Sequence, residues 1–222
     1  MTYQFDFSVV WDSWKLLLSG TLTTLYLTLF SSVLALIFGI VIMVARRSPL
    51  RAPRWTAKVF IEVIRNTPFL VQLFFMFFGL PVLGIKFSVT AAAITALTIN
   101  AAAYIAETLR GGVDGLNPGQ IEAGKALGMN KRQIFFDIVL NPSIRSVYPA
   151  LSSQFVLLML TSSVVASISA EELTYTAQVI ESASFRSFEV YIVVTAIYLF
   201  LSICISTLLR LIGGYCFSYP MK

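Results

Sequence analysis

The sequence contains no histidine and only two cysteines, Cys204 and Cys216. The lack of histidine excludes hydrolase sites built on a catalytic histidine and most zinc sites, so we expect no catalytic residue and no metal ligand in this chain. Two cysteines do not make the disulfide framework of a small secreted domain, and we interpret both as structural thiols. No internal repeat is apparent, so residues 1–222 are expected to form one domain.

Charged residues are also scarce: they make up 12% of the chain, against 57% apolar residues. A soluble domain of this size cannot bury so much apolar surface, so the lipid bilayer is the expected surrounding. Five uncharged runs reach the roughly 20 residues that a helix needs to cross the hydrocarbon layer. Each is predicted to be helical, because backbone groups in lipid must be paired within their own segment. The fold class is therefore all-α integral membrane, with predicted spans at 16–44, 66–85, 87–107, 147–169 and 190–210.

Basic residues are distributed unevenly between the segments that connect these spans. With the N-terminus outside, 13 of the 16 Lys and Arg residues fall on the cytoplasmic side, and only Lys15, Lys86 and Arg186 lie outside. The positive-inside rule therefore predicts an external N-terminus and a cytoplasmic C-terminus. The same bias accounts for the net charge of +5 without a nucleic-acid partner. We interpret residues 45–60 as a basic cytoplasmic loop, and we expect Trp11 and Trp14 to anchor the external interface.

A polar segment, residues 117–142, lies on the cytoplasmic side between spans three and four. Asn117 followed by Pro118 is typical of a helix start, and Gly128 is typical of the residue after a helix. Asn130, with Gln133 three residues later, predicts a second helix start. Asn141 and Pro142 are expected to end that second helix. The pattern predicts two short helices joined by a tight turn.

This helix–turn–helix presents small apolar residues beside polar ones, which indicates a segment that docks on another protein. The run GQIEAGKA also matches most of a phosphate-binding loop. No apolar strand precedes it, however, and Ala126 stands where Ser or Thr would hold Mg²⁺, so we expect no nucleotide and no cofactor in this chain.

The segment EAGKALG, followed after nine residues by IVLNP, resembles the EAA motif of importer permeases of the ATP-binding cassette (ABC) class. Glu122, Ala123, Gly128, Ile138 and Leu140 occupy the positions of that motif. Further runs, GTLTTLYLTL, IEVIRNTPFLVQLFF and LTSSVVASISAEEL, are similar to those of the polar amino acid permease family. The resemblance therefore extends over nearly the whole chain.

The resemblance implies the type I importer permease fold in a bacterial inner membrane. It also implies a separate pair of ATPase subunits that bind ATP and Mg²⁺, a second permease subunit and an external substrate-binding protein. Residues 117–129 would be the coupling helix that sits in a cleft of the ATPase. The residues implied in that contact are Glu122, Ala123, Ala126, Leu127, Gly128 and Met129.

The sequence departs from the family pattern at three places. Gly124 replaces the second alanine of the motif, which is expected to loosen the coupling helix. The motif's proline is displaced from position 141 to Pro142. In span four, Met159 and Leu160 stand where the family commonly has Lys-Asp. That loss leaves the substrate class open, and it favours a non-identical second permease that supplies the charge.

Uncharged polar side chains inside the spans are the candidates for the substrate path. They offer hydrogen-bond donors and acceptors to an amino acid zwitterion without the cost of burying a charge. The candidates are Gln72, Asn100, Tyr104, Thr161, Ser162 and Ser163. Hydrogen bonding between helices is an equally good interpretation.

The acidic residues near the ends of the spans have simpler interpretations. Glu107 and Arg110, three residues apart, favour an interfacial ion pair over a gate. Glu171 and Glu172 are expected on an external segment, either solvated or in contact with the binding protein.

Two rival functions remain to be weighed. An ATP-independent channel or secondary transporter fits poorly, because five spans do not divide into two equal inverted repeats and such a protein has no use for a docking helix. An intramembrane enzyme would need a reaction centre, and the sequence offers no candidate. The resemblance therefore implies the membrane-spanning subunit of an ATP-driven importer of polar amino acids or related small solutes.

Overall fold

The computed structural model describes residues 4–216, apart from the side chains at positions 131, 135, 140 and 141. Within this range every element is helical, which confirms the all-α fold class. The long helices are α2 (Trp14–Arg46), α5 (Val89–Asp114), α8 (Asn141–Thr161) and α10 (Ser187–Cys216). The shorter elements are α1 (Ser8–Asp12), α3 (Arg51–Arg65), α4 (Phe69–Phe74), η1 (Phe75–Gly79), η2 (Leu80–Leu83), α6 (Pro118–Ala126), α7 (Lys131–Gln133), η3 (Ile134–Leu140), η4 (Ser162–Ile168) and α9 (Leu173–Ser184).

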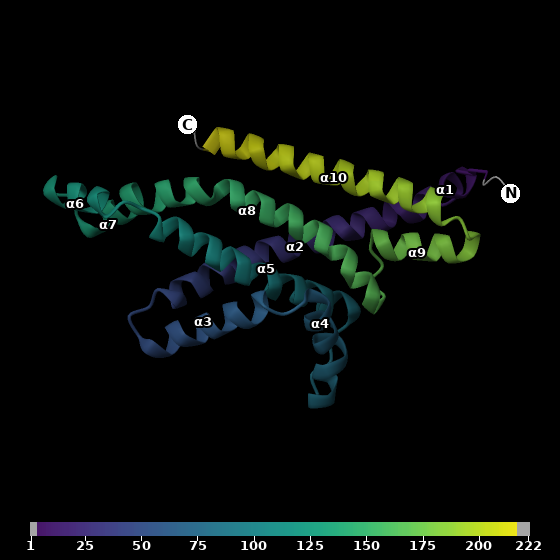
Figure 1. Cartoon of the computed structure of the whole chain (residues 1–222), viewed down its shortest axis with the longest axis horizontal. Helices are drawn as coiled ribbons and strands as arrows, with labels where there is room; N and C mark the ends of the chain where they lie inside the picture. Colours follow the sequence, from purple (N-terminus) through teal and green to yellow (C-terminus); the bar gives the residue numbers. More distant parts are fainter. Residues whose placement is uncertain (1–3, 217–222) are drawn as a thin grey trace.

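Helices cover all five runs that the sequence marks as spans. Four in the described chain are long and apolar enough to cross a bilayer: Trp14–Arg46, Val89–Asp114, Pro142–Ile168 and Ser187–Cys216. The fifth candidate is a bent pair, α3 followed by Phe69–Leu83, with an angle of 109° at the break. The predicted second span, residues 66–85, corresponds to the second half of this pair. From the break, α4 turns away from the long helices (Figure 1).

The predicted loop at residues 45–60 is wrong, because α2 continues to Arg46 and α3 begins at Arg51. Pro53 does not prevent the helix, since it is the third residue of α3, where a backbone N–H has no partner within the helix. Ala57 and Ile61 lie one turn apart and are buried. Through this face α3 packs against α2 and α5.

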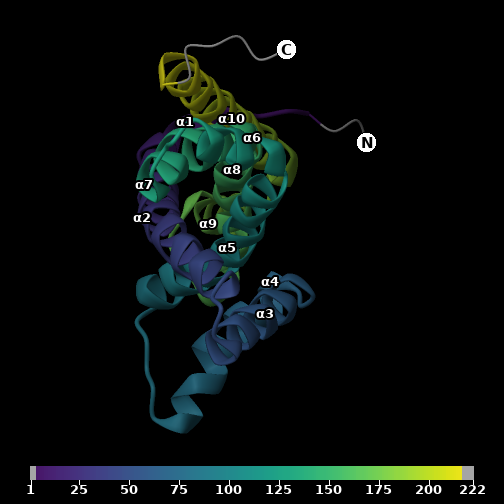
Figure 2. The same cartoon turned by 90° about the vertical axis from the view of Figure 1, so that its left-hand side faces the viewer.

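Helix α5 is central in the bundle, as its alanine content predicts. Seven of its eight alanines are almost completely buried: Ala92, Ala93, Ala96, Ala101, Ala102, Ala103 and Ala106. A Cβ atom at Gly39 of α2 would lie 2.6 Å from Cγ2 of Ile105 and 3.2 Å from the carbonyl oxygen of Ala102. Small residues therefore bring the backbones of α2 and α5 together, as in other membrane bundles. Figures 1 and 2 show α2, α5 and α8 side by side.

The prediction that Asn141 and Pro142 end a helix is also wrong. The chain continues from α7 through the π-helix η3 into α8. In a regular α-helix the ring of Pro142 would clash with the carbonyl of Ile138, four residues earlier. Ile138 lies in η3, and the wider π-helical turn relieves that clash. The second half of the helix–turn–helix is thus continuous with a candidate span.

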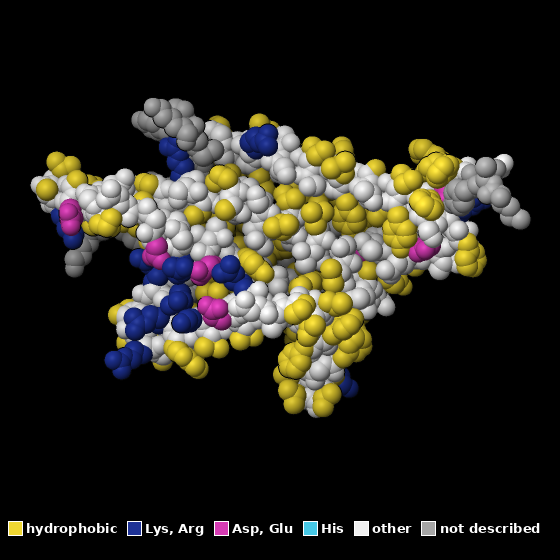
Figure 3. Space-filling view, in the orientation of Figure 1, with side chains coloured by type: hydrophobic (Ala, Val, Ile, Leu, Met, Phe, Trp, Pro, Cys, Tyr) yellow, Lys and Arg dark blue, Asp and Glu magenta, His cyan; other side chains and the backbone are white. Residues whose placement is uncertain are grey.

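The two ends of the bundle differ in their charge. Helices α6 and α7 lie at one end, and the N-terminal segment, α1 and α9 lie at the other (Figure 1). Lys and Arg side chains gather toward the α6 end and around α3, whereas the middle of the surface is largely apolar (Figure 3). The segment from α4 to η2 exposes large apolar side chains, among them Val71, Phe75, Phe78, Val82 and Leu83.

Candidate coupling segment and transport path

The helix–turn–helix at residues 117–142 is capped by asparagines, as the sequence predicts. Oδ1 of Asn117 accepts a hydrogen bond from the N–H of Gly119 at 2.9 Å. Oδ1 of Asn130 accepts from the N–H groups of Arg132 and Gln133, both at 3.0 Å. Oε1 of Gln133 accepts from the N–H of Asn130 at 2.9 Å, so the second start is a complete capping box.

The turn between the two helices depends on Gly128. Its φ of +74° lies in the left-handed region, which glycine adopts at no steric cost. The N–H of Met129 donates to the carbonyl of Gly124, and the N–H of Gly128 donates to that of Lys125, both at 3.0 Å. This pair of bonds is the Schellman arrangement that ends a helix tightly.

The residues implied in ATPase contact lie at this tip. Leu127 is 82% exposed. Glu122, Ala123, Ala126 and Gly128 are exposed as well, and Met129 is half-buried. Leu127 does not pack in the core of this chain. Its exposure alone does not show a binding site, because single exposed leucines are common on protein surfaces. The contact of these residues with an ATPase stays a prediction.

Gly124, the departure from the motif, has a packing reason. It is the buried residue of α6. A Cβ atom there would overlap Cδ1 of Ile138 in η3 and lie 3.4 Å from Sδ of Met129. The glycine therefore seats α6 closely against η3, and the expected loosening of the helix is offset by this contact.

Ion pairs tie α2, α3 and α5 together near the coupling segment. The guanidinium of Arg110 donates to both oxygens of Glu107, at 2.5 and 3.1 Å, and to Asp114 at 2.5 Å. Asp114 also pairs with Arg47 of α2. Arg65 of α3 lies 3.9 Å from Glu107. The contact between Glu107 and Arg110 confirms the predicted ion pair.

Three of the predicted substrate-path residues lie close together between α4 and α5. Nδ2 of Asn100 donates to Oε1 of Gln72 at 3.0 Å. Nε2 of Gln72 donates to the carbonyl of Ile64 and to Oγ1 of Thr67, both at 2.8 Å. Gln72 thereby pairs backbone and side-chain groups at the break between α3 and α4. Tyr104 lies one turn further along α5, where the guanidinium of Arg65 sits 5.3 Å from its ring centroid.

Two hydroxyls of the other predicted group, at Ser162 and Ser163, bond to carbonyls of the preceding turn. Ser162 is fully buried and donates to the carbonyl of Met159 at 2.6 Å, and Ser163 donates to that of Leu160 at 2.7 Å. Thr161 is half-buried at the end of α8. Element η4 packs against both α4 and α5, so the two groups of candidates lie on neighbouring elements. Their contact with a substrate stays a prediction.

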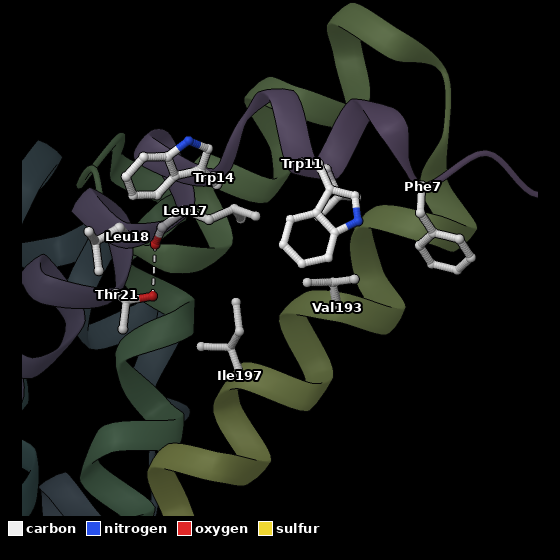
Figure 4. A pocket seen from close by; sticks show the side chains of 9 residues that line it. Phe7, Trp11, Trp14, Leu17, Leu18, Thr21, Val193 and Ile197 are labelled. Atoms are coloured by element: carbon white, nitrogen blue, oxygen red, sulfur yellow. Dashed lines mark hydrogen bonds between the residues drawn. The ribbon is translucent and has the colours of Figure 1, made fainter.

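A groove of about 680 Å³ lies elsewhere, between the N-terminal helices and α10. Figure 4 shows Trp11, Trp14, Val193 and Ile197 along it. The hydroxyl of Thr21, a polar group of its lining, is bonded to the carbonyl of Leu17 at 2.7 Å. An amino acid zwitterion would find few partners there. This groove therefore suits hydrocarbon. The interfacial position of the tryptophans stays a prediction.

Glu171 and Glu172, the acidic residues expected on an external segment, have different surroundings. Glu171 is exposed, but Glu172 is fully buried. Both predicted alternatives, a solvated side chain and a contact with the binding protein, are therefore wrong for Glu172. Its side chain caps α9, accepting from the N–H of Tyr175 at 2.9 Å. A local signal existed for helix α9 itself, though not for the burial of Glu172: Leu173, Ala177 and Ile180 repeat at helical spacing, and all three are buried.

Glu181 lies at the other end of α9. The hydroxyls of Ser187 and Tyr191 donate to its two oxygens at 2.6 and 2.9 Å. These bonds hold the pKa of Glu181 below its usual range. They connect the end of α9 with the start of α10.

Comparison with known proteins gives consistent results. Residues 31–214 match the family described as binding-protein-dependent transport system inner membrane component. The chain is 39% identical to the probable glutamine ABC transporter permease protein GlnP of Bacillus subtilis (strain 168), over 74% of this chain and 76% of that protein. It is 34% identical to the glutamine transport system permease protein GlnP of Escherichia coli (strain K12), over 93% and 95%.

Solved structures with this fold include transporter subunits. A chain from the crystal structure of an amino acid ABC transporter with histidines is 33% identical, with a TM-score of 0.89, and the match covers 96% of this chain and all of that one. A chain from the inward-facing MetNI methionine ABC transporter has a TM-score of 0.73 at 21% identity, over 92% and 97% of the two chains, which supports the fold alone.

Proposed function

Because the chain belongs to the family of inner membrane components of binding-protein-dependent transport systems, we propose that it is the membrane-spanning permease of an ATP-driven importer of polar amino acids. Relatives named as glutamine permeases make glutamine the first substrate to test. ATP and Mg²⁺ bind to a separate ATPase, and an external binding protein delivers the substrate. This chain supplies the path and no catalytic residue.

The observation that carries this proposal is the exposed, doubly capped turn around Gly128, joined without a break to α8. A force applied at Leu127 passes through η3 directly into a candidate span, because α7, η3 and α8 form one continuous helix. The contact of Gly124 with Ile138 keeps α6 fixed to that helix. A channel or a secondary transporter has no need for such an element.

The proposed orientation places the α6 end in the cytoplasm and the α9 end outside. The Lys and Arg residues around α3 and the end of α5 support it (Figure 3), because cytoplasmic segments of membrane proteins are rich in these residues. An ATPase can then reach the coupling segment, and a binding protein can reach α9.

We also propose that a second, non-identical permease completes the path. Leu160 is 40% exposed on α8, and Met159 is fully buried, so this part of the chain offers no charge to a substrate. The intact mass of the complex purified from native membranes tests this proposal. Two different permeases in one complex would support it, and two identical copies would contradict it.

Uptake tests the function itself. The native complex would be reconstituted in proteoliposomes with its binding protein outside, and radiolabelled glutamine would be measured with ATP or a non-hydrolysable analogue inside. We expect radiolabelled glutamine to accumulate with ATP inside the vesicles and not with the analogue. Equal uptake with both nucleotides would contradict the proposal and favour a channel.

A further inference from the structure

The buried carboxyl of Glu172 joins three helices at the external end of the bundle. Besides capping α9 through Tyr175, it accepts a hydrogen bond from the hydroxyl of Tyr198 in α10, at 2.6 Å to Oε2. Oγ1 of Thr24 in α2 lies 3.5 Å from the same oxygen. None of these contacts is local in sequence apart from the cap. The side chain is fully buried, and so is that of Thr24.

Counting hydrogens fixes the direction of the bonds. Tyr198 has one hydroxyl hydrogen and uses it on Glu172. Thr174 of α9, 2.9 Å from the same phenol oxygen, must therefore be the donor to Tyr198. Oγ1 of Thr24 accepts from the N–H of Leu173 at 3.1 Å. The start of α9 is thus bonded to α2 through Thr24 and to α10 through Tyr198.

The choice of glutamate is informative. Ser, Thr, Asp and Asn are the usual N-cap residues, because a short side chain reaches the nearby N–H groups. Glutamate is longer than capping requires, and the extra length lets its second oxygen meet Tyr198 on another helix. A residue present only to cap α9 would not need that reach.

Helix α9 also fits α2 without a gap. A Cβ atom at Gly20 would overlap Oγ1 of Thr176 and lie 3.0 Å from Cα of Leu173. Leu17, Leu173 and Ala177 pack beside this contact in one buried cluster. Sliding α9 along α2 would break both this fit and the bonds of Glu172. Figure 1 shows α9 beside the outer ends of α2 and α10.

We propose that Glu172 is a positioning residue that holds α9 against α2 and α10, so that these three elements move as one body when the external end opens and closes during transport. The inference rests on the proposed function, since it concerns the ATP-driven cycle. It assigns no substrate contact to Glu172. Transport then requires the bonds of Glu172, whereas ATP hydrolysis at the far end does not.

The first test compares Glu172→Ala with Glu172→Gln and with Glu171→Gln, a control at the exposed neighbouring residue. Alanine removes the acceptor of the Tyr175 N–H and leaves the Tyr198 hydroxyl with Thr174 as its partner. We expect the amount of glutamine imported per ATP hydrolysed to fall at least about tenfold, with ATP hydrolysis retained. In Glu172→Gln the side-chain amide can accept a hydrogen bond from Tyr175 and donate one to Tyr198. The import per ATP hydrolysed by this variant should therefore stay within about threefold of the natural value. Glu171→Gln should leave both ATP hydrolysis and the import per ATP hydrolysed unchanged. An unchanged ratio in Glu172→Ala would overturn the proposal, as would an equal fall in import and hydrolysis.

The second test fixes α9 to α2 covalently. The Cβ atoms of a Gly20→Cys and Thr176→Cys pair would lie 3.1 Å apart, which is shorter than the disulfide range of about 3.5–4.5 Å, so α9 and α2 must separate by a few tenths of an ångström for the bond to form. The pair is placed in a chain whose Cys204 and Cys216 are replaced by alanine. If α9 and α2 move together, the oxidised chain imports at the rate of the reduced chain. Oxidation of the same cysteine pair in Glu172→Ala should also restore the amount of glutamine imported per ATP hydrolysed. Import that stops on oxidation overturns the inference, whereas an absence of ATP-driven import by the natural complex contradicts the proposed function.

Discussion

The close crossing of α5 and α8 near the coupling segment makes a quantitative prediction. Gly112 of α5 is buried, and a Cβ atom there would overlap Cγ1 of Val147 and lie 3.1 Å from the carbonyl oxygen of Ser143. Neighbouring Gly111 is exposed, with nothing within 4 Å of a Cβ atom. Gly111→Ala and Gly112→Ala therefore add the same methyl group to the same helix in different surroundings.

Both substitutions gain about 1 kcal/mol from the higher helix propensity of alanine. Gly112→Ala also overpacks the crossing, which typically costs about 1–3 kcal/mol. The difference between the two variants isolates that packing term. Taking about 2 kcal/mol, the melting temperature of Gly112→Ala should lie about 4–8 °C below that of Gly111→Ala.

The assay is thermal unfolding of the purified complex in nanodiscs, followed by tryptophan fluorescence. A Val147→Ala background removes the overlapping methyl group, so the cost of Gly112→Ala should be smaller there than in the natural chain. Equal melting temperatures for the two glycine variants would refute the reasoning, since they would mean that α5 and α8 do not approach as described.

Three further predictions concern other parts of the molecule. Leu127→Asp should leave the melting temperature unchanged, because the side chain is exposed. It should reduce ATP-driven import at least about tenfold, which corresponds to about 1.4 kcal/mol lost at a docking contact. Import at the natural rate would count against the coupling role. Gln72→Leu should lower the melting temperature by several degrees, since it leaves the Ile64 carbonyl unpaired at the break between α3 and α4; no change would show that the glutamine does not brace that break. The lowered pKa of Glu181 contributes stability at neutral pH that is lost as the pH falls below about 4.3, where free glutamates titrate. The hydrogen-exchange protection at the junction of α9 and α10 should therefore fall less on acidification in Ser187→Ala than in the natural chain. An equal fall in both chains would contradict this prediction.

Much of the fold follows from patterns that are local in sequence. The alanines of α5 predict a central helix, because only small side chains allow close approach on all sides, and they are buried. The capping box at Asn130 and the left-handed turn at Gly128 were also predicted, since both depend on neighbouring backbone groups.

Other features were missed although a signal existed. Ala57 and Ile61 repeat at helical spacing, but Pro49 and Pro53 were interpreted as loop residues when Pro53 occupies a first turn that tolerates it. The glycine at position 124 was judged against helix propensity alone. Its packing partner, Ile138, lies on the next helix, and propensity takes no account of that contact.

The remaining features depend on contacts between distant residues. The bend of 109° after α3 arises where Gln72 bonds back to Ile64 and across to Asn100. The burial of Glu172 depends on Thr24 and Tyr198, which lie 148 and 26 residues away. A charged residue between two spans suggests solvent when read alone, and only the assembled bundle provides its partners.

The most direct test of the account is a cross-link from the exposed turn. In the native complex, Leu127→Cys would be treated with a short bifunctional reagent and the products identified by intact mass, with Ser182→Cys on the exposed surface of α9 as the control. The account predicts a product that joins this chain to an ATPase subunit from position 127 and none from position 182. Labelling at position 127 without an ATPase adduct in an intact complex would contradict the proposed coupling contact.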